Sequence, residues 1–396
     1  MAALDLTPFP LVQMRPIANG RNEWVALSLD LHAGAGGGAG AAQAAALLPE
    51  IAGLLAAIAP LDCVLLLDTP AQLTPPLLAQ LPAQRVVLAV DAAALALDGA
   101  ARRLAHLHDQ GYRILLDGAV PDGAARPAGL RGVARDCSPA STAPAPGSLA
   151  ALFGPHLAYG IADAKRLRDC AQAGFDWFSG AYPLQARAAG AGEAPSRRPL
   201  LALLALLAND ADSRELEQLL KQDPVLSYHL LKLVNSAAFA VSTQITSFAQ
   251  AIALLGRRQL QRWLQLLLYA RLDADGPRNP LLPLAALRAA QLEMLCKMDG
   301  GERDEQDLAF MTGAFSLLEP LLGMHMAEIV GDLRLPPHVE DALLRRAGLL
   351  GARLRLVETD TVPGPEMLAQ AGIDAASWWR SQLHAFHWAI QVGRNV

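Results

Sequence analysis

The feature that most constrains the fold is a repeated strand-and-helix pattern in the first half of the chain. Short apolar runs read as β-strands, and Ala/Leu-rich stretches with helical spacing lie between them. Strands that alternate with helices at this spacing favour a parallel sheet with crossover helices, either open or closed into a barrel. The strand candidates are residues 23–31, 62–68, 85–90, 112–117 and 175–178, and the helix candidates lie around residues 41–58, 72–81, 92–110 and 162–173.

From about residue 200 onward, the pattern is helical and the strand signals stop. Asp212 and Glu215 have the spacing of a capping box, in which side chains satisfy amide groups at a helix start. Pro224 suits the first position of the next helix, with Asp223 as its cap, because the missing amide hydrogen would have been unpaired there anyway. The second half is therefore predicted to be an all-α helical bundle.

A joint between two of these helices is predicted from residues 230–239, LLKLVNSAAF. Leu230 belongs to the buried stripe of the first helix. Asn235 and Ser236 are expected to bond local backbone groups in the turn, and Phe239 is expected to pack it. Gly256 is expected to close a later helix in a left-handed conformation, before a further helix over residues 257–272.

The chain of 396 residues is long enough for two domains, each with a sizeable core. Residues 186–199 are rich in Ala, Gly and Pro and separate the two patterns, so we place the interdomain linker there. The predicted organisation is an α/β domain over residues 1–186, a linker over 187–199 and a helical domain over 200–396.

The composition excludes several classes of protein. Charged residues make up 18% of the chain against 53% hydrophobic, which is typical of a globular protein, and the formal net charge of -5 gives no footprint for nucleic acid or an anionic membrane. The four cysteines form no CxxC motif, which indicates separate thiols in a reducing compartment. No signal peptide and no apolar window of roughly 20 residues is present, so a cytoplasmic location is expected.

Generic catalytic motifs are absent, and the histidines form no clear metal site. The dipeptide His108-Asp109 is interpreted as a solvated helix end. His384 and His387 could share a helix face, but a metal site needs a third ligand. The aromatic residues around them indicate core packing, with a partner surface left open.

A small basic cluster consists of Arg257, Arg258 and Arg262 at a predicted helix start. A solvated face is the favoured interpretation, and contact with an acidic partner is the alternative. Together with Trp263 the cluster is too small to indicate nucleic-acid binding.

Residues 216–270 resemble the HDOD domain, an all-helical relative of the HD phosphohydrolases. The resemblance is carried by Asp223-Pro224, by LLKLVNSAAF and by ITSFAQAIALLG, and it continues through residues 309–324. HDOD domains lack the metal-binding His and Asp residues of those relatives. Here His229, His325 and His338 stand apart from any His-Asp pair, so the resemblance implies no metal and no hydrolytic nucleophile in this half.

The first half resembles a degenerate EAL domain, whose active members are barrels that hydrolyse cyclic di-GMP with metal-bound carboxylates. Residues 14–31 resemble the first strand region of that family, Gln-Pro-Ile followed by Glu-x-Leu-x-Arg. Arg15 stands at the Gln position, Val25 at the metal-binding Glu and Leu29 at the phosphate-contacting Arg, whereas Leu27 matches.

Two later segments carry the same resemblance. Residues 111–120 resemble the strand that ends in Asp-Asp-Phe, with Asp117 at the first Asp and Gly118-Ala119 after it. In residues 157–183, Tyr159 and Ala162 stand at two Glu positions, and Ser179-Gly180-Ala181 stands at Gln-Gly-Tyr. The resemblance therefore implies that nearly all metal carboxylates, and the metals with them, have been lost.

Together these segments resemble the EAL-HDOD signalling proteins of bacteria. The implied fold is a multi-domain chain, with a shortened, degenerate EAL-like TIM barrel of α/β class followed by an all-α HDOD bundle. The implied function is a non-enzymatic regulatory scaffold that binds a protein partner in stress, motility or biofilm control, with no catalytic residue, metal or cofactor.

The alternative is a receptor that binds cyclic di-GMP without hydrolysis, with Asp117 as the candidate contact. Leu29 disfavours it, because the guanidinium that would pair with a phosphate is missing. A homodimer is left open. The residues expected to shape the structure or the partner surface are Asp223, Pro224, Leu230, Asn235, Ser236, Phe239, Gly256, Arg257 and Arg258.

Overall fold

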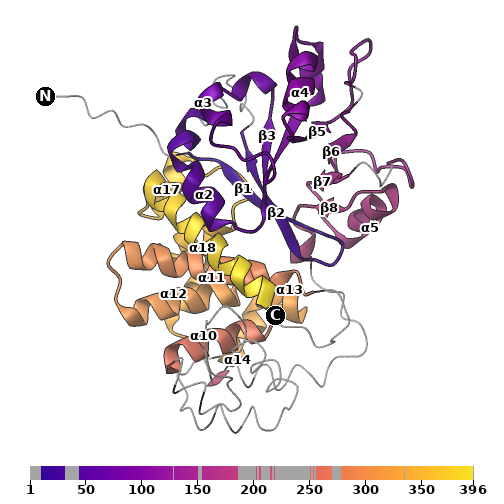
Figure 1. The fold of residues 1–396 in the computed structure, drawn as a ribbon. Helices are drawn as coiled ribbons and strands as arrows, with labels where there is room; N and C mark the ends of the chain where they lie inside the picture. Colours follow the sequence, from indigo (N-terminus) through magenta and orange to yellow (C-terminus); the bar gives the residue numbers. More distant parts are fainter. Residues whose placement is uncertain are drawn as a thin grey trace, which may run out of the picture. The chain divides into compact units, whose positions relative to one another are not determined.

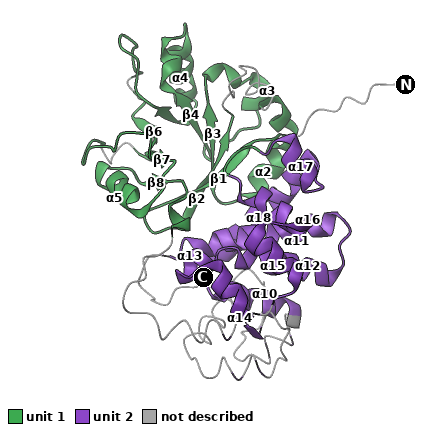
Figure 2. Cartoon of the chain, turned by 180° about the vertical axis from the view of Figure 1, so that it is seen from behind, with its two compact units in different colours: residues 1–185, 360–362 green, residues 186–359, 363–396 purple. Residues whose placement is uncertain are grey.

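The computed structural model describes residues 10–31, 44–127, 129–149, 154–185, 256–269, 278–333 and 335–395, together with isolated residues between 202 and 253. The chain divides into two compact units, one formed by residues 1–185 with 360–362 and the other by residues 186–359 with 363–396 (Figure 2). The predicted linker over 187–199 lies outside the described residues, so the predicted domain boundaries stay predictions.

Unit one is a closed barrel of eight strands, which follow one another around the barrel in chain order (Figure 1). Strand β1 is antiparallel to both of its neighbours, β2 and β8, and the other neighbouring strands are parallel. The prediction of an α/β first half with a parallel sheet is confirmed. The strands are β1 (Gln13–Ala18), β2 (Trp24–Asp30), β3 (Asp62–Leu67), β4 (Val86–Asp91), β5 (Arg113–Asp117), β6 (Gly132–Asp136), β7 (Leu157–Tyr159) and β8 (Trp177–Phe178).

The strand predictions cover five of these strands and miss β1, β6 and β7. Strand β1 contains Arg15 and Pro16, β6 begins with Gly132, and β7 has only three residues, so none carries a clear run of strand-forming side chains. Gly132 is required by the packing, because a Cβ there would lie 2.9 Å from the backbone oxygen of Ile114 on β5.

Helices cover the outside of the barrel between most of its strands (Figure 1). They are α2 (Ile51–Ala57), α3 (Pro75–Leu78), α4 (Ala100–Asp109) and α5 (Ala164–Ala173), with the short 3-10 helices η1 (Leu48–Glu50), η2 (Pro70–Gln72), η3 (Ala92–Ala96) and η5 (Tyr182–Leu184). Helix α5 begins where Asp163 accepts a hydrogen bond from the Arg166 amide at 2.8 Å, and it ends at Gly174, whose φ is 109°. Within the described part of the barrel, no helix joins β5 to β6 or β6 to β7.

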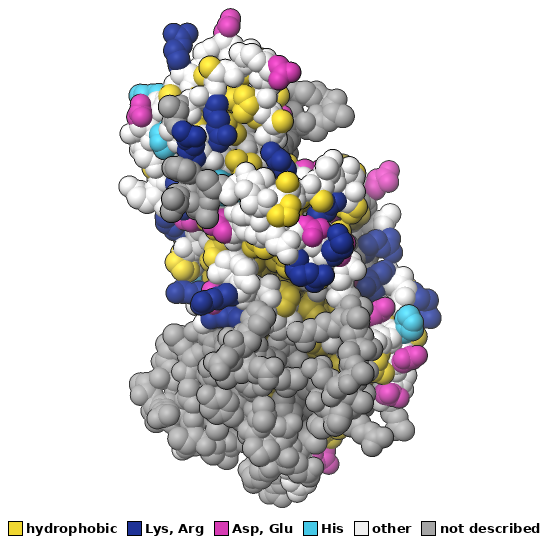
Figure 3. Space-filling view, turned by 90° about the vertical axis from the view of Figure 1, so that its right-hand side faces the viewer, with side chains coloured by type: hydrophobic (Ala, Val, Ile, Leu, Met, Phe, Trp, Pro, Cys, Tyr) yellow, Lys and Arg dark blue, Asp and Glu magenta, His cyan; other side chains and the backbone are white. Residues whose placement is uncertain are grey.

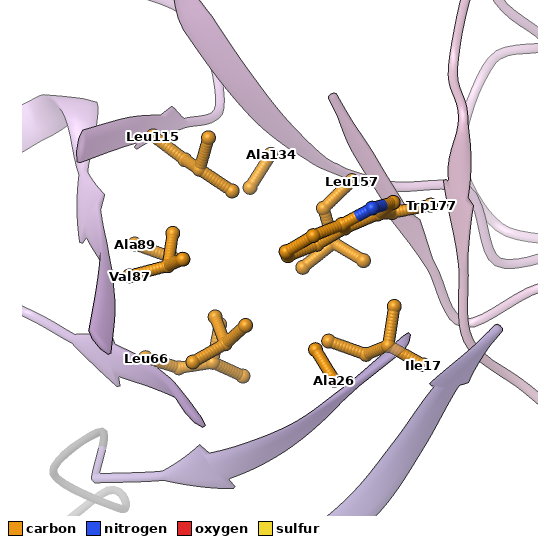
Figure 4. Packing of buried hydrophobic residues seen from close by; sticks show 10 residues of the cluster. Ile17, Ala26, Leu66, Val87, Ala89, Leu115, Ala134, Leu157 and Trp177 are labelled. Atoms are coloured by element: carbon orange, nitrogen blue, oxygen red, sulfur yellow. The ribbon is translucent and has the colours of Figure 1, made fainter. Parts of the chain in front are cut away.

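The barrel interior is a packed apolar core. Trp177 of β8 reaches into the interior beside Leu157 (Figure 4). Because side chains alternate along a strand, each strand contributes one residue or two alternate residues to this core. Its members are Ile17, Ala26, Val64, Leu66, Val87, Ala89, Leu115, Ala134, Leu157 and Trp177.

Unit two is helical wherever the structure describes it, which confirms the predicted helical second half. Helix α11 lies at its centre and packs against α12, α16 and α18. None of the described helices is long and apolar enough to cross a membrane. The helices are α10 (Arg257–Leu267), α11 (Leu281–Met298), α12 (Arg303–Phe315), α13 (Leu318–Leu322), α14 (Met326–Leu333), α15 (Pro337–Arg345), α16 (Gly348–Glu358), α17 (Pro365–Gln370) and α18 (Ala375–Asn395).

Gly256 differs from its predicted conformation. Its φ of 78° is positive as expected, but its ψ of 155° lies outside the left-handed helical region. Gly256 precedes α10 as the N-cap residue, so its backbone turns the chain into the next helix.

Candidate active site

Polar side chains gather at the carboxyl ends of the barrel strands. Strands β2, β4, β5 and β6 each end in an aspartate, β3 is followed by one, and β7 ends in a tyrosine. An apolar residue two or four positions earlier in each strand belongs to the interior core, so the alternation of side chains turns these polar groups inward as well. We call this set the acidic ring: Asp30, Asp68, Asp91, Asp117, Asp136 and Tyr159.

Asp117 and Tyr159 are paired within the ring. Asp117 is buried, with 7% of its surface exposed. The hydroxyl oxygen of Tyr159 lies 2.9 Å from Oδ2 and 3.1 Å from Oδ1 of Asp117, so the phenol donates to the carboxylate. Ala134 of β6 pairs with Asp117 between the two strands, and its small side chain leaves room for the phenol to reach across.

The phenol of Tyr159 keeps its proton. Burial, followed by the negative charge of Asp117 and the hydrogen bond to it, raises the pKa of Tyr159 well above its usual 10.0. The charges of Asp136 and Asp30 act in the same direction. Tyr159 is therefore a hydrogen-bond donor throughout the neutral pH range.

Two other carboxylates of the ring are held by their own local partners. Asp136 accepts hydrogen bonds from the amide and the hydroxyl of Ser138 at 2.8 and 3.1 Å. Asp91 accepts one from the amide of Ala93 at 2.8 Å. Each of these two carboxylates is therefore oriented by the loop that follows its strand.

The acidic ring does not fit a resident metal ion. A metal-dependent hydrolase of this type would need several carboxylates around one point, since Mg²⁺ takes oxygen ligands in octahedral geometry. Nowhere in the described part of the chain do three His, Cys, Asp or Glu side chains form a group that could hold a metal ion. Both oxygens of Asp117 instead accept the hydroxyl of Tyr159.

Sequence reasoning singled out Asp117 and noted Tyr159 but did not predict that they touch. It missed Asp30, Asp68, Asp91 and Asp136 as site residues, although each stands at the end of an apolar strand. That repeated position is the signal, because the carboxyl ends of parallel strands meet at one face of a barrel. Leu29, at the expected Arg position, is fully buried.

The solvated face predicted for the basic cluster is wrong for the arginines whose side chains are described. Arg258 Nε lies 2.5 Å, and Arg262 Nη2 lies 3.0 Å, from Oδ1 of Asp307 on α12. Arg262 also pairs with Glu293 on α11, and only 13% of its side chain is exposed. The acidic groups come from this chain, because α10 packs its basic face against its own neighbours. The side chain of Arg257 lies outside the described residues.

Two further features agree with the sequence interpretation. His108 and Asp109 are exposed at the end of α4, as predicted for a solvated helix terminus. Trp378, Trp379 and Phe386 of α18 are buried, which confirms core packing of the aromatic segment. The predicted structural residues Asp223, Pro224, Leu230, Asn235, Ser236 and Phe239 lie outside the described residues.

Comparison with known proteins identifies one domain. The family model of the HDOD domain matches residues 200–313, so the C-terminal region carries an HDOD domain. The chain is 29% identical over 191 residues to "Cyclic di-GMP phosphodiesterase CdgJ" of Vibrio cholerae. The matched region covers 47% of this chain and 44% of CdgJ. It is 28% identical over 179 residues to "Uncharacterized protein YuxH" of Bacillus subtilis, and this matched region covers 44% of this chain and 43% of YuxH.

The chain thus matches less than half the length of each of these curated relatives. A solved structure from Shewanella amazonensis SB2B, whose name assigns it only provisionally to the phosphohydrolases, covers 50% of this chain with 18% identity and a TM-score of 0.34. That likeness is too low to support an argument about fold or function.

The expectation of a non-enzymatic scaffold, and with it the receptor that binds without hydrolysis, is corrected by these findings. A protein similar to this chain is named as a phosphodiesterase. The expectation that proteins resembling this chain have no enzymatic activity therefore does not hold. That expectation rested on the loss of the metal-ligand positions. The HDOD part of the predicted family is confirmed.

Proposed function

We propose that this chain is a phosphodiester hydrolase of the cyclic di-GMP class that acts in bacterial signalling, and that its barrel is an EAL-like domain. The similarity to CdgJ supports the type of reaction. The observation that carries the location is the hydrogen-bonded, partly buried Asp117/Tyr159 pair at the carboxyl end of the barrel, because barrel enzymes place their active sites at this face.

The pair can supply the general base for phosphodiester hydrolysis. A water oxygen bonds to phosphorus while the bond from phosphorus to the 3′ oxygen breaks, and a linear dinucleotide forms. Asp117 is suited to take the proton of the attacking water, since Tyr159 holds its carboxylate in place. The single proton of the Tyr159 phenol stays in the hydrogen bond to Asp117, and the leaving 3′ oxygen takes a proton from solvent.

The acidic ring also suits the bases of such a substrate. Guanine presents adjacent N–H donors, which one carboxylate can accept together, and Asp30 and Asp91 are half-buried at the ring. The same carboxylates repel the two phosphates of the substrate. Added salt screens that repulsion, so we expect the KM to fall as the ionic strength rises.

The direct test is incubation of the purified chain with cyclic di-GMP, followed by chromatography for the linear dinucleotide. Parallel samples contain Mg²⁺, Mn²⁺ or a chelator. We expect cleavage, and we expect Asp117→Asn to lower kcat by about 10²- to 10⁴-fold, the range for loss of a general base. The matched control is Asp62→Asn, because Asp62 lies at the opposite, amino end of β3 and pairs with Arg113 at 2.8 Å.

No linear product under any of these conditions would refute the proposed activity. Cleavage by Asp117→Asn at the rate of the unmodified chain would move the reaction away from the barrel. The protein partner and the cytoplasmic location stay predictions, and the possible homodimer stays open.

A further inference from the structure

Two cysteines lie side by side beneath the surface of the barrel. Cys137 directly follows β6, Cys170 lies in α5, and both are fully buried free thiols. The two thiols interact closely enough that each shifts the pKa of the other. They share one apolar cluster with Ala158, Ile161, Ala173, Phe175, Phe178 and Tyr182.

Each thiol has a neighbour in the chain that reaches the surface. Asp136, next to Cys137, and Ala171, next to Cys170, are both exposed. The segment after Cys137 is fastened to α5 by Arg166, whose Nη2 donates to the backbone oxygens of Ser138 at 3.2 Å and Ser141 at 2.9 Å. For Cys137 to react, we expect this short loop to open locally while the barrel stays folded.

The two thiols differ in acidity. The hydrogen bond from Cys137 is the largest influence that lowers the pKa of Cys170, and the charge of Arg166 acts in the same direction. The shared hydrogen bond and burial raise the pKa of Cys137. Cys170 is therefore the thiol that ionises first, and Cys137 is its proton donor.

We propose that Cys137 and Cys170 form an oxidative modification site, which a hydroperoxide converts into a disulfide and a dithiol reductant restores. The thiolate of Cys170 attacks the peroxide, so that an S–O bond forms, the O–O bond breaks and one water or alcohol leaves. The sulfur of Cys137 then attacks Cys170, the S–S bond forms, and a second water carries away the oxygen. Two thiols are oxidised by two electrons, and one peroxide is reduced.

The disulfide would tie the end of β6 to α5 beside the acidic ring. The amide of Cys137 donates to the backbone oxygen of Tyr159 at 2.8 Å, and Asp136 precedes Cys137. The modification itself requires no hydrolase activity, so it stands or falls independently of the proposed function.

The other two thiols provide internal controls. Cys63 is as deeply buried on β3, and burial raises its pKa to about 12. Cys296 on α11 is partly exposed, and burial raises its pKa as well. Neither thiol is expected to ionise readily, because the thiolate is the reactive form.

The test treats the reduced, full-length chain with hydrogen peroxide, blocks the remaining thiols with an alkylating reagent and maps the peptides by mass spectrometry. We expect a cross-linked peptide that joins Cys137 to Cys170, loss of two of the four thiols and full recovery with dithiothreitol. Cys170 should react more than about tenfold faster than Cys63, given their different thiolate fractions.

Two variants separate the steps. Cys137→Ser should stop at a sulfenic acid on Cys170, which dimedone traps, and Cys170→Ser should leave Cys137 as a thiol. Circular dichroism verifies that both variants fold, and the peptide map of the unmodified chain decides the question if they do not. Equal oxidation rates of Cys170 and Cys63, or oxidation of Cys170 without the cross-link, would overturn the proposal.

Discussion

At the scale of single residues, the environment of Tyr159 gives the clearest prediction. Asp117→Asn removes the nearest negative charge from the phenol, so we expect the pKa of Tyr159 to move down toward its ordinary 10.0. Ultraviolet difference titration of tyrosinate measures the shift, with Tyr159→Phe to assign the signal. Asp62→Asn should leave the titration unchanged, and an unchanged curve for Asp117→Asn would contradict the pairing.

The same raised pKa links stability to pH. A group whose pKa is higher in the folded chain stabilises the fold below its unfolded pKa, near 10.0 for Tyr159, and that stability is lost as the pH rises above it. We expect Tyr159→Phe to lose less stability between neutral pH and strongly alkaline pH than the unmodified chain. Urea unfolding at a series of pH values measures the difference. Parallel curves for the two proteins would mean that the phenol contributes nothing.

Arg262 is the second residue with a defined energetic role. Its guanidinium pairs with Glu293 and Asp307 and lies 5.1 Å from the centre of the Phe310 ring. Burial raises the pKa of Glu293, and the charge of Arg262 opposes this rise. Arg262→Ala would leave Glu293 with Arg258 alone, whose Nη2 lies 3.9 Å away, so we expect a loss of about 1–3 kcal/mol in the free energy of unfolding.

The matched control for Arg262 is an exposed ion pair. Lys165 pairs with Asp169 at 3.0 Å on α5, and 79% of its side chain is exposed. Lys165→Ala should change the free energy of unfolding by less than about 1 kcal/mol. On the face shown in Figure 3, both basic and acidic side chains of the described residues lie exposed. Similar losses for both variants would contradict a special role of Arg262.

At the scale of helices and strands, close approach decides which glycines can change. Gly313 lies where α12 crosses α11, and a Cβ there would lie 2.6 Å from the Cα of Ala289. We expect Gly313→Ala to destabilise the helical unit by about 1–3 kcal/mol, since the two backbones must separate.

Gly331 in α14 gives the opposite expectation in the same unit. A Cβ there would meet no atom within 4 Å, so Gly331→Ala should stabilise the helix by about 0.5–1 kcal/mol through helix propensity. Thermal unfolding monitored by circular dichroism compares the two variants. A stabilising Gly313→Ala would show that α11 and α12 do not pack this closely.

At the scale of the whole molecule, two compact units with separate cores predict two unfolding transitions. Trp177 belongs to the barrel core (Figure 4). Trp177→Ala should destabilise the barrel by about 3–5 kcal/mol through the cavity it leaves, and Gly313→Ala should move the other transition. Differential scanning calorimetry resolves them. One transition that both variants shift equally would show that the two units unfold together.

The local pattern of residues decided the type and order of most elements. The runs over 62–68, 85–90 and 112–117 became β3, β4 and β5, because apolar and β-branched side chains favour a buried strand wherever they stand. The switch to helices in the second half and the HDOD resemblance could also be recognised from the local pattern of residues. Strands such as β7, with three residues, were not, because they are strands only by pairing with their neighbours.

Tertiary structure alone decided how distant residues meet. Closure of the barrel placed the ends of β5 and β7 where Tyr159 reaches Asp117, 42 positions away in the chain. Helix packing turned the arginines of α10 toward Glu293 and Asp307, and α5 set Cys170 against Cys137. Spacing along a chain determines which face of an element a side chain occupies, whereas its partner across space depends on how the elements pack.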